Sequence, residues 1–114
     1  MLNFIVLLNV IFTKSLDDFM DKLKQREVTI VYRKHCPFSQ AALDTLDFLK
    51  LNYNPVEEKS DPELVQHVRE KYHRTFPAIF VNGRLLGGYD DLQMSIKSGR
   101  LNKLLNRKQD DIKI

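Results

Sequence analysis

The chain has little of several residue types, and each scarcity excludes a class of protein. Its 114 residues include a single cysteine, Cys36, so it forms no internal disulfide, no cysteine-rich zinc site and no Cys-x-x-Cys redox pair. Four glycines and four prolines are too few for a fibrous or disordered chain. A chain of this length can bury enough apolar surface to fold as one domain without such crosslinks.

Strong charge and long apolar runs are also missing. The formal net charge is +3, and the basic residues form no dense stripe of the kind that binds nucleic acid, so we expect no nucleic-acid partner. The apolar segment Leu2–Phe12 is shorter than the roughly 20 residues of a membrane-spanning helix. The 43% of apolar and 29% of charged residues are typical of a soluble globular domain.

Residues 1–14 form an apolar N-terminal segment that allows two interpretations. Its length fits the apolar region of a secretory signal, although no Lys or Arg precedes that region and small residues are missing from the expected cleavage zone at 10–15. The other interpretation is a strand or arm packed on the domain. We therefore expect the secretory pathway, in the endoplasmic reticulum or Golgi, if the segment is a signal or anchor, and the cytoplasm otherwise.

Hydrophobic periodicity and turn signals predict alternating helices and strands. Helices are expected at 15–26, 37–51, 60–73, 90–98 and around 101–105, and strands at 28–32, 53–58, 78–81 and 84–86. Pro55 places the second strand at a sheet edge, and Asn82-Gly83 predicts a tight hairpin between the last two strands. This order predicts an α/β fold, with a mixed four-stranded sheet and helices on both of its faces.

Cys36 lies between the end of a predicted strand and the start of a predicted helix. Backbone N–H groups and the helix dipole favour an anion there, and Arg33, Lys34 and His35 bring positive charge. All of these lower the pKa of a thiol, and the thiolate is the nucleophile. A lone cysteine is otherwise most often a small core residue, but a core position would not carry three basic neighbours and a following Pro37. The sequence therefore predicts a reactive cysteine.

Three motifs in this order and at these elements resemble those of the glutaredoxin family. They are Cys36-Pro37-Phe38-Ser39, Arg74-Thr75-Phe76-Pro77 and Gly87-Gly88-Tyr89-Asp90-Asp91. The resemblance covers about residues 15–105. It implies a thioredoxin-like fold, with a glutaredoxin-like domain at 15–106 between the apolar segment 1–14 and a polar tail at 107–114.

The active-site motif resembles a monothiol glutaredoxin, because Ser39 stands where the family usually has a second cysteine. Pro37 after Cys36 is similar to the dithiol-type lineage and differs from the iron–sulfur-carrying class, which has glycine there. Some fungal glutaredoxins of the secretory pathway combine such a motif with an apolar N-terminus. The resemblance implies an enzyme, with Cys36 as the catalytic residue and Ser39 as support for its thiolate.

The implied reaction is the glutathione-dependent reduction of glutathione mixed disulfides, on proteins or on small thiols. Glutathione would be the co-substrate, and glutathionylated proteins or small mixed disulfides would be the partners. The implied cellular roles are redox homeostasis and the response to oxidative stress. We expect a monomer, and a dimer only if a cluster bridges two subunits.

The resemblance also implies a glutathione-binding groove. Pro77 would be a cis proline facing Cys36, and Asp90 would hold the glutathione ammonium at a helix start whose N–H groups bind the γ-glutamyl carboxylate. Arg33 matches a family lysine that pairs with the glycine carboxylate, and Tyr89 stands where many members have Cys or Ser. The implied residues are Arg33, Phe38, Arg74, Thr75, Phe76, Pro77, Gly88, Tyr89 and Asp90, with Gln66 as a further candidate.

Two other functions remain open from the sequence. Two subunits could each supply Cys36 to a [2Fe–2S] cluster completed by two glutathiones, although Pro37 argues against this by resemblance. The chain could also be a thioredoxin-like binding module without catalysis. His67 and His73 are six residues apart, which is not a same-face ligand spacing on a helix, so we expect both at the surface and no metal bound by them.

Overall fold

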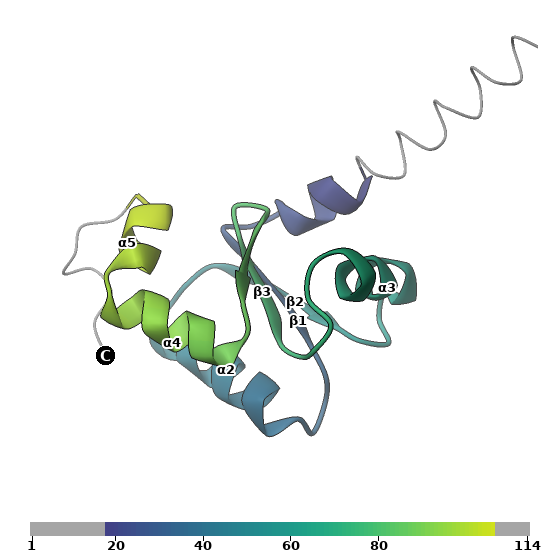
Figure 1. The fold of residues 1–114 in the computed structure, drawn as a ribbon, viewed down its shortest axis with the longest axis horizontal. Helices are drawn as coiled ribbons and strands as arrows, with labels where there is room; N and C mark the ends of the chain where they lie inside the picture. Colours follow the sequence, from purple (N-terminus) through teal and green to yellow (C-terminus); the bar gives the residue numbers. More distant parts are fainter. Residues whose placement is uncertain (1–17, 107–114) are drawn as a thin grey trace, which may run out of the picture.

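The computed structural model describes residues 18–106 and contains a four-stranded mixed sheet (Figure 1). Residues 18–23 are helical. The further elements are β1 (Val28–Tyr32), α2 (Pro37–Phe48), β2 (Tyr53–Glu57), α3 (Pro62–Lys71), β3 (Ala78–Val81), β4 (Arg84–Gly87), α4 (Tyr89–Lys97) and α5 (Arg100–Leu104). The predictions for residues 1–14, for the Ser15 helix start and for the tail 107–114 lie outside the described residues.

The strands lie in the order β2-β1-β3-β4, with β1 parallel to β2 and the other two pairs antiparallel. β1 is therefore internal and β2, which contains Pro55, is an edge strand, as predicted. The mixed α/β sheet expected from the sequence is confirmed. Between residues 18 and 106, no helix combines the length and the apolar content that crossing a membrane requires.

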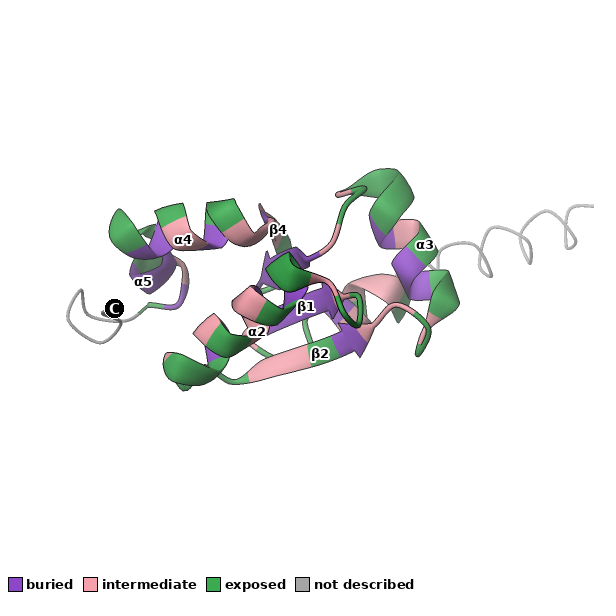
Figure 2. Cartoon of the chain, turned by 90° about the horizontal axis from the view of Figure 1, so that it is seen from below, coloured by how far each residue is buried: buried purple, intermediate pink, exposed green. Residues whose placement is uncertain are grey.

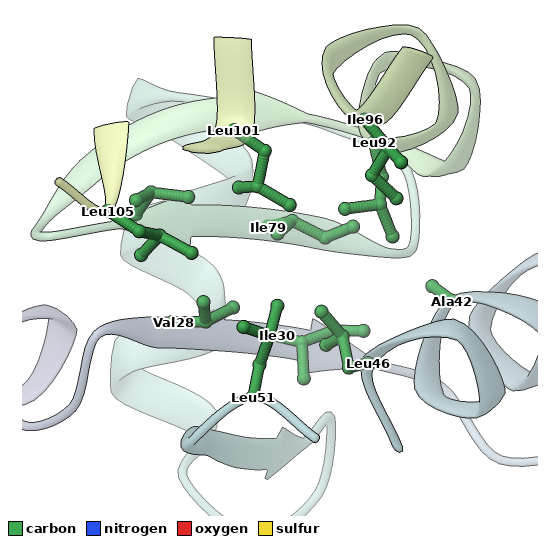
Figure 3. Packing of buried hydrophobic residues seen from close by; sticks show 11 residues of the cluster. Val28, Ile30, Ala42, Leu46, Leu51, Ile79, Leu92, Ile96, Leu101 and Leu105 are labelled. Atoms are coloured by element: carbon green, nitrogen blue, oxygen red, sulfur yellow. The ribbon is translucent and has the colours of Figure 1, made fainter. Parts of the chain in front are cut away.

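Helices cover both faces of the sheet, because residues along its buried strands point alternately to opposite sides (Figures 1 and 2). Ile30 of β1 and Ile79 of β3 pack with α2, α4 and α5 in one cluster, which Figure 3 shows. Val31 and Phe80, their neighbours in sequence, pack on the opposite face with α3 and Leu23. These two layers hold the strand ends that carry the candidate site.

Local sequence signals start and connect the elements as expected. The Asp61 carboxylate accepts a hydrogen bond from the Leu64 N–H at 3.3 Å, and Pro62 occupies the first turn of α3. Asn82 and Gly83 have φ of 51° and 83° between β3 and β4, the left-handed conformation that a two-residue hairpin requires.

Three predicted helix ends are wrong. The helix expected at 15–26 ends at Leu23, and residues 24–27 form a turn that leads into β1. α2 stops at Phe48 rather than at residue 51, because Lys50 turns to a φ of 55°, and Leu51 is buried in the loop that follows. α3 stops at Lys71 rather than at 73. Tyr72, which follows α3, is 38% exposed, although its ring and that of Phe80 pack edge to face.

The packing of α2 predicts unequal costs for two truncations in one helix. Leu46 is fully buried and Phe48 is 67% exposed. Leu46→Ala should lower the free energy of unfolding by about 2–5 kcal/mol, because it removes a core side chain and leaves a cavity. Phe48→Ala should change it by less than about 0.5 kcal/mol. Urea unfolding of both variants measures this, and equal losses would contradict the orientation of α2.

Candidate active site

The pairing of β1 with β3 brings two loops together at one end of the sheet. Val31 lies opposite Ala78 in this antiparallel pair, so the residues after β1 and those before β3 leave the sheet side by side. The two loops touch, since the Arg33 guanidinium carbon lies 4.4 Å from the centre of the Phe76 ring. The Phe76–Pro77 peptide bond is cis, as the family resemblance implied.

Cys36 is the N-cap residue of α2. Its backbone is extended, with φ −96° and ψ 117°, and Pro37 follows at the first helical position. The Cys36 carbonyl accepts the first intrahelical hydrogen bond, from the Gln40 N–H at 2.9 Å. The thiol is free and partly accessible. The sequence therefore places the thiol where the unpaired N–H groups of the first turn meet solvent.

Hydrogen bonds hold the pKa of the Cys36 thiol below its usual value. The largest cause is the Ser39 hydroxyl, followed by the Ser39 N–H; burial opposes them, while the Phe38 N–H and the Arg33 charge add smaller contributions in the same direction. Lys34 and His35, which the sequence places beside the thiol, are not among the causes. The thiolate is thus stabilised mainly by the helix start itself.

Ser39 is well placed for this role because it is fixed. Its side chain is fully buried, and its hydroxyl oxygen accepts a hydrogen bond from the Arg33 N–H at 3.3 Å. Because the Ser39 oxygen accepts this backbone hydrogen bond, the Ser39 O–H remains available to donate to the Cys36 sulfur.

A groove of about 200 Å³ runs between the starts of α2 and α4 and the cis-proline turn. It is lined by Phe38, His73, Thr75, Phe76, Pro77, Gly88, Tyr89, Asp90 and Asp91. All of these except His73 and Asp91 belong to the set that the resemblance implied. The structure therefore gathers most of the predicted binding residues, from three separate segments of the chain, around one groove.

Two neighbouring aspartates at the start of α4 have different surroundings. The Asp91 carboxylate accepts a hydrogen bond from the Gly88 N–H at 3.0 Å and caps the helix. Asp90 makes no hydrogen bond or ion pair with any residue in 18–106. The Tyr89 and Asp90 N–H groups also have no partner there. The groove thus ends in free N–H donors beside a free carboxylate.

Three predicted binding residues lie outside this groove. The Arg33 Nε lies 3.1 Å from both carboxylate oxygens of Glu58, and the guanidinium stacks beside Phe76 at the margin of the groove. Arg74 and Gln66 line a separate polar cleft of about 340 Å³, together with Arg69 and Glu70.

Sequence reasoning missed four residues at or near the groove. Glu58 pairs with Arg33, and the Arg69 guanidinium lies 5.4 Å from the centre of the Phe76 ring. Asp91 was recognised only as part of a motif. His73, expected at the surface, is partly buried and lines the groove. The one sequence feature that could have indicated this role is that His73 directly precedes the motif Arg74-Thr75-Phe76-Pro77.

The support that Ser39 gives to the thiolate can be tested by titration. Ser39→Ala removes the largest cause of the lowered pKa of Cys36, so that pKa should rise toward the value of a free thiol. The ultraviolet absorbance of the thiolate as a function of pH measures this. Ser95→Ala is the matched control, because Ser95 is a buried serine that bonds the Leu92 carbonyl. An unchanged Cys36 titration in Ser39→Ala would make Ser39 a bystander.

Comparisons with known proteins agree with this arrangement. The glutaredoxin family model matches residues 10–86. Glutaredoxin-1 of Saccharomyces cerevisiae is 32% identical over 94 residues, which cover 75% of this chain and 84% of the relative. Glutaredoxin 1 of Rickettsia bellii is 34% identical over 91 residues, which cover 75% of this chain and 93% of that one.

Solved structures are similar in fold. A wheat glutaredoxin superposes with a TM-score of 0.67 at 26% identity, over 80% of this chain and 92% of that one. A buckwheat glutaredoxin–glutathione complex does so with 0.66 at 21% identity, over 82% and 92%. With a thioredoxin-like fold, a thiolate at a helix start and a groove beside it, this chain belongs to the glutaredoxin family of thiol–disulfide oxidoreductases.

Proposed function

We propose that the protein reduces glutathione mixed disulfides by a monothiol mechanism, with Cys36 as the nucleophile. The observation that carries this proposal is the Cys36 thiol with a lowered pKa at the start of α2, beside the groove. The sequence has no second cysteine, so the partner thiol has to come from another molecule. One related protein, the buckwheat glutaredoxin, has been solved in complex with glutathione.

In the first step, the Cys36 thiolate attacks the glutathione sulfur of a mixed disulfide. A bond forms between the two sulfurs, the original S–S bond breaks, and the substrate leaves as a thiolate that takes a proton from water. In the second step, the thiolate of another glutathione attacks the glutathione sulfur bound to Cys36. Oxidised glutathione leaves, and Cys36 returns as a thiolate. Its lowered pKa helps here, because a weakly basic thiolate is a good leaving group.

The cis-proline turn would hold the cysteine of glutathione. The N–H and C=O groups of Phe76 make no hydrogen bond with any residue in 18–106, although Phe76 lies only two residues before Ala78, the first paired position of β3. An extended peptide can pair with both groups, as a strand pairs with a sheet edge. This pairing would align the substrate disulfide with the Cys36 sulfur for in-line attack.

The start of α4 would hold the γ-glutamyl end. The Tyr89 and Asp90 N–H groups are free to bind its carboxylate, and the free Asp90 carboxylate is available to its ammonium. Gly88 contributes space rather than a donor, because its N–H is already bonded to Asp91. Arg33 would reach the glycine carboxylate only by sharing its guanidinium with Glu58.

The enzymatic role of Cys36 predicts the result of a single substitution. Wild type should catalyse glutathione-dependent reduction of a small mixed disulfide, coupled to glutathione reductase, and Cys36→Ser should reduce the rate to the uncatalysed background. Phe48→Ala should keep the wild-type rate, because Phe48 is exposed at the far end of α2. Equal rates for wild type and Cys36→Ser would leave a thioredoxin-like binding module instead of an enzyme.

Alanine substitutions at the adjacent Gly87 and Gly88 should affect different properties, stability at Gly87 and glutathione binding at Gly88. A Cβ at Gly88 would meet only ordinary contacts, at 3.6 Å or more, so Gly88→Ala should fold normally but narrow the groove and weaken glutathione binding several-fold. A Cβ at Gly87, where φ is 132°, would overlap the Asp91 side chain, so Gly87→Ala should lower stability by about 1–3 kcal/mol. Urea unfolding and glutathione titration separate the two effects. A stable Gly88→Ala with unchanged glutathione affinity would argue against the groove as the site.

A further inference from the structure

We propose that His73 makes glutathione binding pH-dependent, by donating a hydrogen bond from Nε2 to the γ-glutamyl carboxylate when its ring is protonated. The proposal rests on the proposed function of the groove as a glutathione site. His73 belongs to the wall of that groove, between the end of α3 and the cis-proline turn. None of the residues implied by family resemblance covers this position.

The backbone fixes the orientation and tautomer of the His73 ring. Nδ1 lies 2.8 Å from the Thr75 carbonyl oxygen, and a carbonyl oxygen only accepts, so Nδ1 carries a hydrogen. The neutral ring therefore presents an unprotonated Nε2, whose lone pair repels a carboxylate. Protonation converts the same atom into a charged donor. The ring thus has one variable position, and that position is Nε2.

Nε2 lies next to the proposed carboxylate site. A Cβ built on Gly88 would be 3.7 Å from Nε2 and 3.6 Å from the adjacent Cε1, so this edge of the ring borders the space above Gly88. The free N–H groups of Tyr89 and Asp90 follow directly along the chain. Nε2 makes no hydrogen bond with any residue in 18–106. A carboxylate bound to these N–H groups is therefore within reach of an otherwise unused donor.

Other titratable groups also face the groove, and the experiment has to separate them from His73. Asp90 and Asp91 from α4 and the Tyr89 phenol line it. The Cys36 thiol is not a lining group, but it lies at the start of α2, two residues before Phe38, which is one. Carboxyl and phenol groups in general titrate outside the range of about pH 5.5 to 7.5, in which imidazoles do. A Cys36→Ser background removes the thiol.

The test measures the affinity for S-methylglutathione, which has no thiol, at about pH 5.5 and about pH 7.5. The full-length Cys36→Ser protein should bind it about threefold more tightly at the lower pH, the size of effect expected for one partly exposed ion pair. Adding His73→Gln should abolish this difference, because glutamine can still donate to the Thr75 carbonyl but carries no charge. Adding His67→Gln is the matched control, since His67 stacks on Phe19 instead of lining the groove.

Each result decides the question. A pH dependence that His73→Gln removes and His67→Gln keeps supports the proposal. Binding that is independent of pH, or equally dependent on pH with His73→Gln, overturns it and leaves the proposed function intact. No binding of S-methylglutathione at either pH overturns both.

A second measurement needs no substitution at position 73. If protonation tightens binding threefold, linkage requires that bound S-methylglutathione raise the pH at which the His73 ring signals change, by about half a pH unit. Proton NMR of the Cys36→Ser protein, with and without saturating ligand, measures this. The His67 signals should not move, and an unmoved His73 titration would overturn the proposal even if the His73→Gln protein failed to fold.

Discussion

The antiparallel pairing of β1 with β3 is the constraint on which the site depends. Through it the loop with Cys36 and the turn with Pro77 leave the sheet at the same end, and the hairpin after β3 returns the chain to the start of α4. Both strands are buried on both faces, so a shift of one residue would exchange the contents of the two cores. The apolar packing that stabilises the fold therefore also sets the distances within the groove.

Hydrogen bonds from the first turn of α2 stabilise the thiolate more than the nearby basic side chains do. Arg33, the cation that does contribute, makes the smallest contribution to the lowered pKa of Cys36, and its guanidinium is already paired with Glu58. Exposed charges are screened by water and by competing partners. A buried hydroxyl such as that of Ser39 keeps one distance and one direction. The first turn of α2 is therefore the main cause of the lowered pKa of Cys36.

Much of the fold follows from local sequence, and much of the site does not. Periodicity, Pro55 and Asn82-Gly83 predicted the strands, the edge and the hairpin, since each signal acts over a few residues. The end of α2 does not follow from local sequence, because the burial of Leu51 comes from tertiary packing beyond the helix.

The sequence predicted the groove residues that lie within the three motifs. It did not predict the residues that come close to the groove only when the chain folds. Glu58 is 25 residues from its partner Arg33, and no local pattern links the two. His73 was expected at the surface. It lies close to Gly88 only because the turn before β3 and the turn before α4 meet in the fold, and local sequence does not show this.

The buried serine at position 39 also affects how the protein responds to oxidation of Cys36. A thiol oxidised to a sulfenic acid is commonly rescued by a neighbouring cysteine, and here that neighbour cannot form a disulfide. Protection of an oxidised Cys36 as a disulfide would therefore require a thiol from another molecule.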